Sequence, residues 1–268
     1  MLTRVHHVGL VVRRLEDGLA FWQGTLGLPI AKQATIQDQG VRAALLPIGR
    51  SEIELLEPVD DASGVAKFLA RRGEGLHHVC FETPDVAAEL ATARGAGLPV
   101  IDETPRPGLA GLICFLHPKG TAGVLVEFAT PPPGEHPDAS VGAGPFAGIA
   151  LREVTVQSRD AVSAQTVFAT RLGLARGPAE AAPGVTAAAV TTGGVCLKFL
   201  SADPGSSSAD ASALRRAVES VGDGLAGLVL EVPDLPAAGH ALRVLPEGDI
   251  RLDAARCHGV PLTFRAAS

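Results

Sequence analysis

One order of strand and helix patterns recurs along this 268-residue chain, and the recurrence limits the possible folds more than any other feature. Residues 1–130 carry two passes of a strand, a helix and further strands, judged from apolar spacing and from Gly and Pro punctuation. The expected strands are 4–12, 40–48, 51–58, 74–84, 111–118 and 123–130, and the expected helices are 16–27, 66–73 and 85–97. We interpret each pass as one βαβββ module.

The second half of the chain repeats the first. The tripeptide Leu-Gly-Leu occurs at 26–28 and again at 172–174, and it fixes the register between the halves. Strand-like runs at 194–202, 223–234 and 258–264 resemble earlier ones, at 51–58, 74–85 and 122–128. Between the halves lies a Pro- and Gly-rich stretch. The sequence therefore predicts an α+β protein of four βαβββ modules, with a first domain at 1–130, a linker at 131–146 and a second domain at 147–268.

Composition excludes several classes of protein. The net charge is −6 and Lys and Arg form no block, which argues against nucleic-acid or anionic-membrane partners. No apolar run is long enough to span a bilayer. The four cysteines are widely separated and show no metal-binding or disulfide spacing. We expect reduced thiols and a cytoplasmic location.

Two histidine doublets and two glutamates stand out in the first half. His6-His7 and His77-His78 each lie in the first strand of a module, and Glu54 and Glu127 lie in apolar runs of the last strands. The second histidine of each doublet precedes its glutamate by 47 and 49 positions. Neighbours on a strand face opposite sides, so one histidine of each doublet is expected to serve a site and the other to face away.

Two imidazoles and two carboxylates suit a divalent metal ion. A single strand histidine is more often a hydrogen-bonded core residue than a ligand. A carboxylate in an apolar run is costly to bury unpaired, and the matched spacing of two such pairs favours a metal site. The donor set fits Co, Zn, Mn, Ni or Fe, and the sequence leaves the identity of the ion open.

The motifs HHVGLVV (6–12), IELLEP (53–58), VAKFLARRGEGLHHVCFE (65–82) and FLHPKGTAGVLVEF (115–128) resemble the vicinal oxygen chelate superfamily, which includes glyoxalases, bleomycin-resistance proteins and dioxygenases. The first half resembles its methylmalonyl-CoA epimerase branch. The resemblance implies vicinal-oxygen-chelate domains with cupped mixed and antiparallel sheets, and an acyl-CoA substrate. It also implies one divalent metal ion held by His7, Glu54, His78 and Glu127.

The resemblance implies a reaction as well. The metal would chelate the thioester carbonyl and the neighbouring carboxylate, and would stabilise the enolate formed when the α-proton leaves. Glu127 and Glu54 are the candidate catalytic carboxylates, with Glu127 both ligand and base. Arg106 and Lys119 are weaker candidates for substrate contacts. The sequence does not decide between a pocket residue and a solvated loop charge for Arg106, and for Lys119 it favours a simple turn over contact with a CoA phosphate.

One position departs from the branch. Some relatives carry an acidic residue three positions after the glycine of a Gln-Gly-Val motif, where this chain has Ala43. Glu52 or a metal-bound water would then supply the second proton, or the reaction is not a simple epimerisation. The alternatives are a glyoxalase-type lyase or isomerase, a dioxygenase, and a non-catalytic protein that binds a small molecule.

The second half has lost the four residues. Glu153, Lys198, Gly227 and Thr263 stand where the first half has His7, Glu54, His78 and Glu127. We therefore expect no metal in the second half. We expect it to act as a scaffold in the place of a partner, so that the chain is a monomeric pseudo-dimer. A homodimer and a regulatory module are the alternatives.

Overall fold

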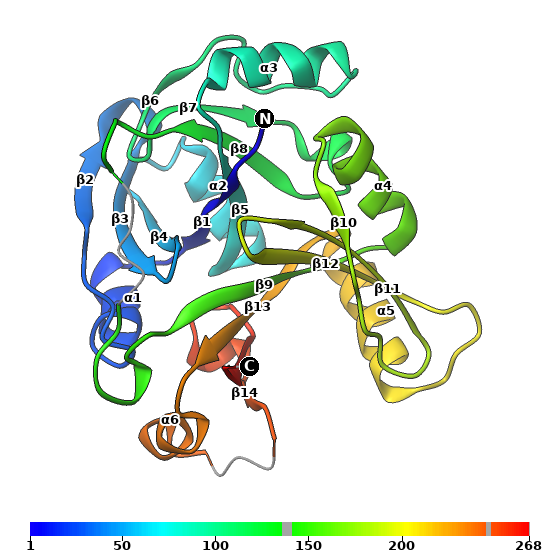
Figure 1. The fold of residues 1–268 in the computed structure, drawn as a ribbon. Helices are drawn as coiled ribbons and strands as arrows, with labels where there is room; N and C mark the ends of the chain where they lie inside the picture. Colours follow the sequence, from blue (N-terminus) through cyan, green and yellow to red (C-terminus); the bar gives the residue numbers. More distant parts are fainter. Residues whose placement is uncertain (136–140, 245–247, 268) are drawn as a thin grey trace. The chain divides into compact units, whose positions relative to one another are not determined.

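A computed structural model describes residues 1–135, 141–244 and 248–267. The middle of the predicted linker, 136–140, lies outside the described residues. The protein is α+β, with two mixed sheets and helices, in the order that the repeated modules predict (Figure 1). Across the described residues, no helix has the length and apolar character that a membrane crossing requires.

The first sheet has the strand order β2-β3-β4-β1-β5-β8-β7-β6. Strand β1 is parallel to β4, and β5 is parallel to β8, while hairpin neighbours are antiparallel. The strands are β1 (Arg4–Val11), β2 (Lys32–Ile36), β3 (Val41–Ile48), β4 (Ser51–Pro58), β5 (Gly75–Glu82), β6 (Arg106–Gly108), β7 (Gly111–Leu116) and β8 (Leu125–Thr130).

The second sheet repeats this arrangement in the order β10-β11-β12-β9-β13-β15-β14. Its parallel pairs are β9 with β12 and β13 with β15. In the described part of the fourth module, one strand fewer is found than in the others. The strands are β9 (Ala150–Gln157), β10 (Ala175–Gly177), β11 (Val185–Thr192), β12 (Val195–Ala202), β13 (Gly224–Val232), β14 (Ile250–Leu252) and β15 (Leu262–Ala266).

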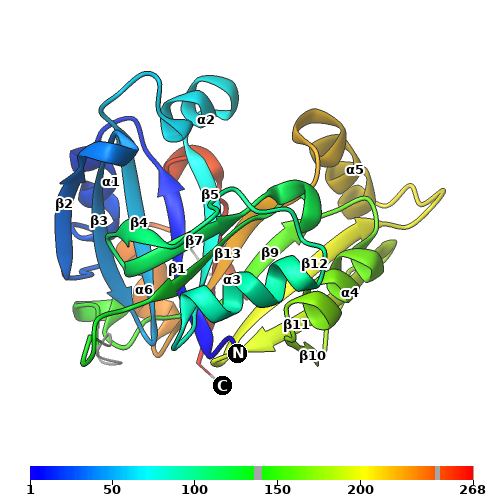
Figure 2. The same ribbon diagram turned by 90° about the horizontal axis from the view of Figure 1, so that it is seen from above.

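Helices pack on the strands of their own or the adjoining module. Figure 2 shows α4 and α5 beside β11 and β12, and the contacts of α1 are with β3 and β4. Several helices begin at a residue whose side chain accepts hydrogen bonds from the first turn, as Asp85 and Asp160 do. The helices are α1 (Leu15–Trp22), α2 (Gly64–Arg72), α3 (Val86–Gly95), α4 (Ala161–Arg171), α5 (Ala209–Val221) and α6 (Leu235–Leu242).

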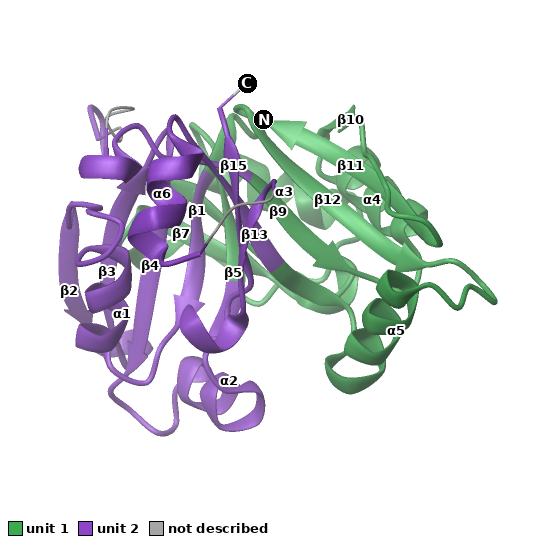
Figure 3. Ribbon diagram, turned by 90° about the horizontal axis from the view of Figure 1, so that it is seen from below, with its two compact units in different colours: residues 1–5, 78–131, 153–226 green, residues 6–77, 132–152, 227–268 purple. Residues whose placement is uncertain are grey.

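By contacts the chain divides into two compact units, coloured in Figure 3. Unit 1 comprises residues 1–5, 78–131 and 153–226, and its core includes the packed rings of Phe168 and Phe199. Unit 2 comprises residues 6–77, 132–152 and 227–268, and its core includes the packed rings of Phe146 and Phe264. Each unit thus takes sequence from both halves of the chain.

Candidate metal centre

His7 and Glu54 meet in the first module because β1 and β4 are parallel. The register pairs His7 with Glu52 and Gly9 with Glu54, so residues 7, 9, 52 and 54 share one face of the sheet. The Nε2 atom of His7 lies 3.5 Å from Oε2 of Glu54. Both side chains are buried. The first of the two predicted pairs is therefore formed within unit 2.

His78 and Glu127 meet in the second module through the same register. Strand β5 pairs His78 with Leu125 and Cys80 with Glu127, so the glutamate again stands two positions beyond the residue opposite the histidine. The Nε2 atom of His78 lies 3.0 Å from Oε2 of Glu127, and both side chains are buried. The ring of Phe115 packs edge-on against His78, with 5.4 Å between centroids. The second predicted pair is thus formed within unit 1.

The atoms of each pair have the chemistry and the spacing of metal ligands. Each residue offers one atom, an imidazole nitrogen or a carboxylate oxygen. Two atoms bound at about 2.1 Å to one ion lie roughly 3–3.5 Å apart. The separations of 3.5 Å and 3.0 Å agree with that spacing. These residues therefore fit a divalent cation.

His6 has a role that its expected orientation on the strand did not reveal. Its Nδ1 lies 2.9 Å from Nδ1 of His7, and the two rings meet edge to face. A hydrogen bond between two Nδ1 atoms requires that one imidazole carry its proton there. With His7 as the donor, its Nε2 carries the lone pair that a metal ion would bind. His6 therefore orients His7, and the doublet itself was the only signal in the sequence.

The second doublet behaves as strand alternation predicts. His77 packs edge-on against Phe68 of α2, with 5.0 Å between ring centroids. The doublet thus supplies one helix contact and one candidate ligand.

Arg106 lies on the same face of the sheet as Glu127. The register pairs Arg106 with Ile113 and Phe115 with Glu127. The guanidinium lies 5.6 Å from the centre of the Phe115 ring, and its Nε donates to Asp102 at 3.0 Å. Its Nη1 is buried without a hydrogen-bond partner in the structure.

Lys119 lies exposed in a 3₁₀ turn, Pro118–Gly120. The ring of His117 accepts a hydrogen bond from the backbone N–H of Lys119 at 3.1 Å. This contact favours the turn over a substrate contact for the His-Pro-Lys-Gly segment.

Ala43 stands where some relatives of the epimerase branch carry an acidic residue, and this position is not accessible to solvent. Ala43 lies on β3, fully buried, opposite Leu56. Glu52, the substitute considered from the sequence, is buried, and its Oε2 lies 3.5 Å from Nδ1 of His6. Glu52 is therefore held next to the candidate ligand His7 rather than at the place of Ala43.

In the second half, Glu153 and Lys198 stand at the positions equivalent to His7 and Glu54. The register of β9 and β12 repeats that of β1 and β4, with Glu153 opposite Cys196 and Lys198 two positions further on. The ammonium of Lys198 lies 3.8 Å from Oε2 of Glu153, and both side chains are largely buried. Burial, with the Glu153 charge beside it, raises the pKa of the Cys196 thiol to about 11.

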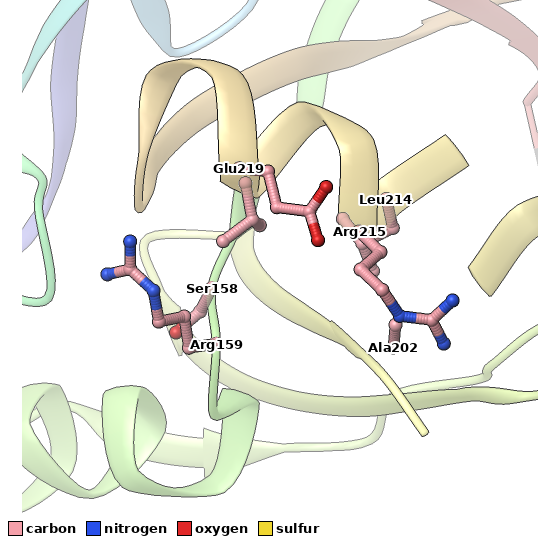
Figure 4. Close-up of a pocket in the computed structure, with 7 residues that line it drawn as sticks. Ser158, Arg159, Ala202, Leu214, Arg215 and Glu219 are labelled. Carbon is pink, nitrogen blue, oxygen red and sulfur yellow. The ribbon is translucent and has the colours of Figure 1, made fainter. Parts of the chain in front are cut away.

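A cavity of about 270 Å³ lies elsewhere in the second half, where β9 and β12 end against α5 (Figure 4). Arg159, Arg215 and Glu219 border it together with apolar side chains of α5. Arg215 donates to the carbonyl oxygen of Ser206 at 3.0 Å. No feature of the sequence pointed to this cavity, and no imidazole or thiol lines it.

Comparisons with known proteins identify relatives of about half of this chain. A family profile described as "Glyoxalase/Bleomycin resistance protein/Dioxygenase superfamily" matches residues 6–115. An ethylmalonyl-CoA/methylmalonyl-CoA epimerase of Cereibacter sphaeroides is 35% identical over 47% of this chain and 97% of its own length. The mitochondrial methylmalonyl-CoA epimerase of Homo sapiens is 32% identical over 47% of this chain and 73% of its own length.

Among solved structures, a Streptomyces coelicolor methylmalonyl-CoA epimerase in complex with 2-nitronate-propionyl-CoA is 40% identical. It covers 49% of this chain and 99% of its own length, with a TM-score of 0.48. Each of these three alignments spans about half of this chain, and the family profile lies in the first half. The chain belongs to the glyoxalase/bleomycin resistance protein/dioxygenase superfamily, as an isomerase of the racemase and epimerase class.

Proposed function

We propose that the two His–Glu pairs together hold one divalent metal ion. The carrying observation is the repeated register, which puts a buried histidine beside a buried glutamate in each module of the first half. The resemblance to the epimerase branch supports one joint site, because the ligand positions of that branch match these four residues. When bound, the ion supplies Lewis-acid stabilisation of negative charge on substrate oxygens.

The proposed reaction is epimerisation at the α-carbon of an acyl-CoA such as methylmalonyl-CoA. The names of the relatives support this substrate class. Glu127 is the proposed base, since its Oε2 is held 3.0 Å from Nε2 of His78 in a buried setting. A desolvated carboxylate removes a proton more readily than a solvated one. Glu54 is the second proposed catalytic carboxylate, and it lies beside His7, which His6 orients.

Arg106 is proposed to bind the carboxylate of the acyl group. A buried guanidinium N–H without an acceptor is costly, and an anionic substrate oxygen would satisfy it. The stacked ring of Phe115 links this arginine to His78. A malonyl-type acyl group carries such a carboxylate, whereas a simple acyl-CoA does not.

The test is exchange of the α-proton. Metal-loaded protein in D₂O should exchange the α-proton of methylmalonyl-CoA, followed by proton NMR, and Glu127→Gln should exchange at least about a hundredfold more slowly. Metal bound at one ion per chain without exchange would reject the epimerase and leave the site. Absence of bound metal would reject both.

Ala43 favours a second candidate, a glyoxalase-type isomerisation, since that position lacks the acid found in some relatives of the epimerase branch. The same metal-loaded protein should then convert a thiohemiacetal formed from methylglyoxal and a thiol, and should leave methylmalonyl-CoA unexchanged.

A further inference from the structure

The cavity against α5 is built from one continuous segment of the chain (Figure 4). All of its lining residues lie between Ser158 and Glu219, within unit 1. Its volume of about 270 Å³ lies just below the ~300–1,000 Å³ that is usual for pockets of drug-sized ligands. The cavity therefore suits a small metabolite rather than a molecule as large as an acyl-CoA.

Two charged residues of the cavity are specific to the second half. Counted back from the glycine that follows each helix, Arg215 and Glu219 of α5 stand where α2 has Ala66 and Ala70. The adjoining lining positions of α5, 214 and 218, are apolar in both helices. Packing of such a helix on its sheet therefore does not require the two charges, which lie at the border of the cavity.

The Glu219 carboxylate has no partner in the part of the chain that the structure describes. It lies one helical turn after Arg215, a spacing at which glutamate and arginine commonly pair on a helix. Arg215 donates elsewhere instead. In Figure 4 the side chains of Arg159 and Arg215 lie on either side of the Glu219 carboxylate. This carboxylate can therefore accept hydrogen bonds from a bound cation.

The two arginines keep N–H groups for an anion. The Nη2 atom of Arg215 donates to the carbonyl oxygens of Asp203 and Ser206, at 3.4 Å and 3.0 Å, which anchors the guanidinium. Its Nε and Nη1 atoms donate to no described residue. The guanidinium of Arg159 forms a long ion pair with Asp223, at 3.6 Å. Since a guanidinium carries five N–H donors that match a carboxylate, both arginines have donors left for an anionic group.

Three classes of ligand do not fit these groups. The guanidinium groups would repel a metal ion, and the lining residues include one carboxylate and no imidazole or thiol. A phosphate or a dicarboxylate would meet the negative charge of Glu219. An uncharged apolar molecule would desolvate the charges at the border without pairing them. A zwitterion avoids all three penalties, because it brings one charge of each sign.

We propose that the cavity binds a free α-amino acid with an apolar side chain. Its ammonium group pairs with Glu219, and its carboxylate pairs with Arg215 and Arg159. Its side chain contacts Leu214 and Val218, the apolar lining residues of α5. The proposal stands independently of the proposed function, because no candidate metal ligand lines the cavity.

Equilibrium dialysis of the metal-loaded chain against labelled L-leucine tests the binding. One leucine should bind per chain, with a Kd below ~1 mM. Two competitors each lack one charge: 4-methylpentanoate has no ammonium group, and 3-methylbutylamine has no carboxylate. Each should bind at least about tenfold more weakly than leucine. Absence of leucine binding at millimolar concentration, or equal binding of leucine and either competitor, would overturn the proposal.

Two variants assign the binding to this cavity. Glu219→Gln should bind leucine about as weakly as the unaltered chain binds 4-methylpentanoate, and Arg215→Gln about as weakly as it binds 3-methylbutylamine. The matched control is Arg216→Gln, an exposed neighbour on α5 outside the cavity, which should bind leucine normally. Unchanged leucine binding in Glu219→Gln would overturn the proposal. If binding were also lost in Glu127→Ala, leucine would be bound at the proposed metal instead.

Discussion

The pairs β1–β4 and β9–β12 have the same register and opposite chemistry. In the first, His7 and Glu54 offer two lone pairs to a cation. In the second, Glu153 meets Lys198, so a side-chain ammonium supplies the positive charge that a carboxylate there requires. One backbone arrangement thus accommodates either a buried His–Glu pair or a buried Glu–Lys pair.

This difference separates what the fold requires from what the site requires. Strands β9 and β13 form without any histidine at the two ligand positions, where Glu153 and Gly227 stand. The fold therefore does not need imidazoles there. The buried histidines of the first half are therefore consistent with the proposed metal site.

The largest expected effect comes from removing one ligand. Glu127→Ala should reduce bound metal from about one ion per chain to near none, measured by plasma emission spectrometry after dialysis. Turnover should fall by about a thousandfold or more, since a metal ion contributes several kcal/mol to the transition state.

The matched control is Thr263→Ala, at the equivalent position of the second half. It should change neither metal content nor turnover. Metal loss in Thr263→Ala, or retained metal in Glu127→Ala, would contradict the contrast between the halves.

Much of this contrast was predictable from the sequence, because strand period and repeat spacing together specify which residues share a face. The α+β class and the repeated modules were confirmed. The helix expected at 16–27 ends at Trp22, because residues 23–26 form a turn before Gly27, which has φ of 72°. The short strands β2, β6 and β10 were not foreseen, since edge strands bury little apolar surface.

Two side-chain contacts of the site leave no periodic signal in the sequence. The contact of His6 with His7 joins neighbours whose side chains were expected to diverge. The stacking of Arg106 on Phe115 joins a loop-like segment to a strand through the short pairing of β6 with β7. Sequence spacing alone does not specify either one.

A smaller effect is expected at the residue that orients a ligand. His6→Ala should weaken metal binding by about 10–100-fold, because the hydrogen bond to His7 is lost, and competition with a chelator measures this. Arg152 is its second-half counterpart and pairs with Glu231 at 2.8 Å. Arg152→Ala should leave metal affinity unchanged. An equal loss of metal affinity in both variants would contradict the orienting role of His6.

The ion pair of the second half should affect stability alone. Lys198→Met removes the ammonium group from beside the largely buried Glu153 carboxylate and should cost about 1–3 kcal/mol of unfolding free energy, from urea titration. The double variant Lys198→Met with Glu153→Gln should recover part of that loss. Metal content should not change in either variant, and a loss of metal would show that the halves are coupled.

The smallest effects concern the thiols. Burial raises the pKa of Cys114 and Cys257 to about 12 and that of Cys196 to about 11. The folded protein should therefore react slowly with a thiol reagent at pH 8, with Cys196 first, and all four cysteines should react in urea.

The sign of the pH effect follows from these raised pKa values. The unfolded chain loses its thiol protons near pH 9, before the folded chain does, so stability should decline as pH rises from about 9 to 11. Cys196→Ala should weaken this decline. A steeper decline in that variant would contradict the assignment.

The composition of the compact units has a consequence for synthesis. Unit 2 joins residues 6–77 to residues 227–268, which the ribosome makes later. Residues 6–77 must therefore wait, at about 5–20 residues per second, for most of the chain to emerge before they meet their partner. The tether between the two segments gives their contact a high effective concentration, so unit 2 should complete itself from its own chain once the late segment has emerged.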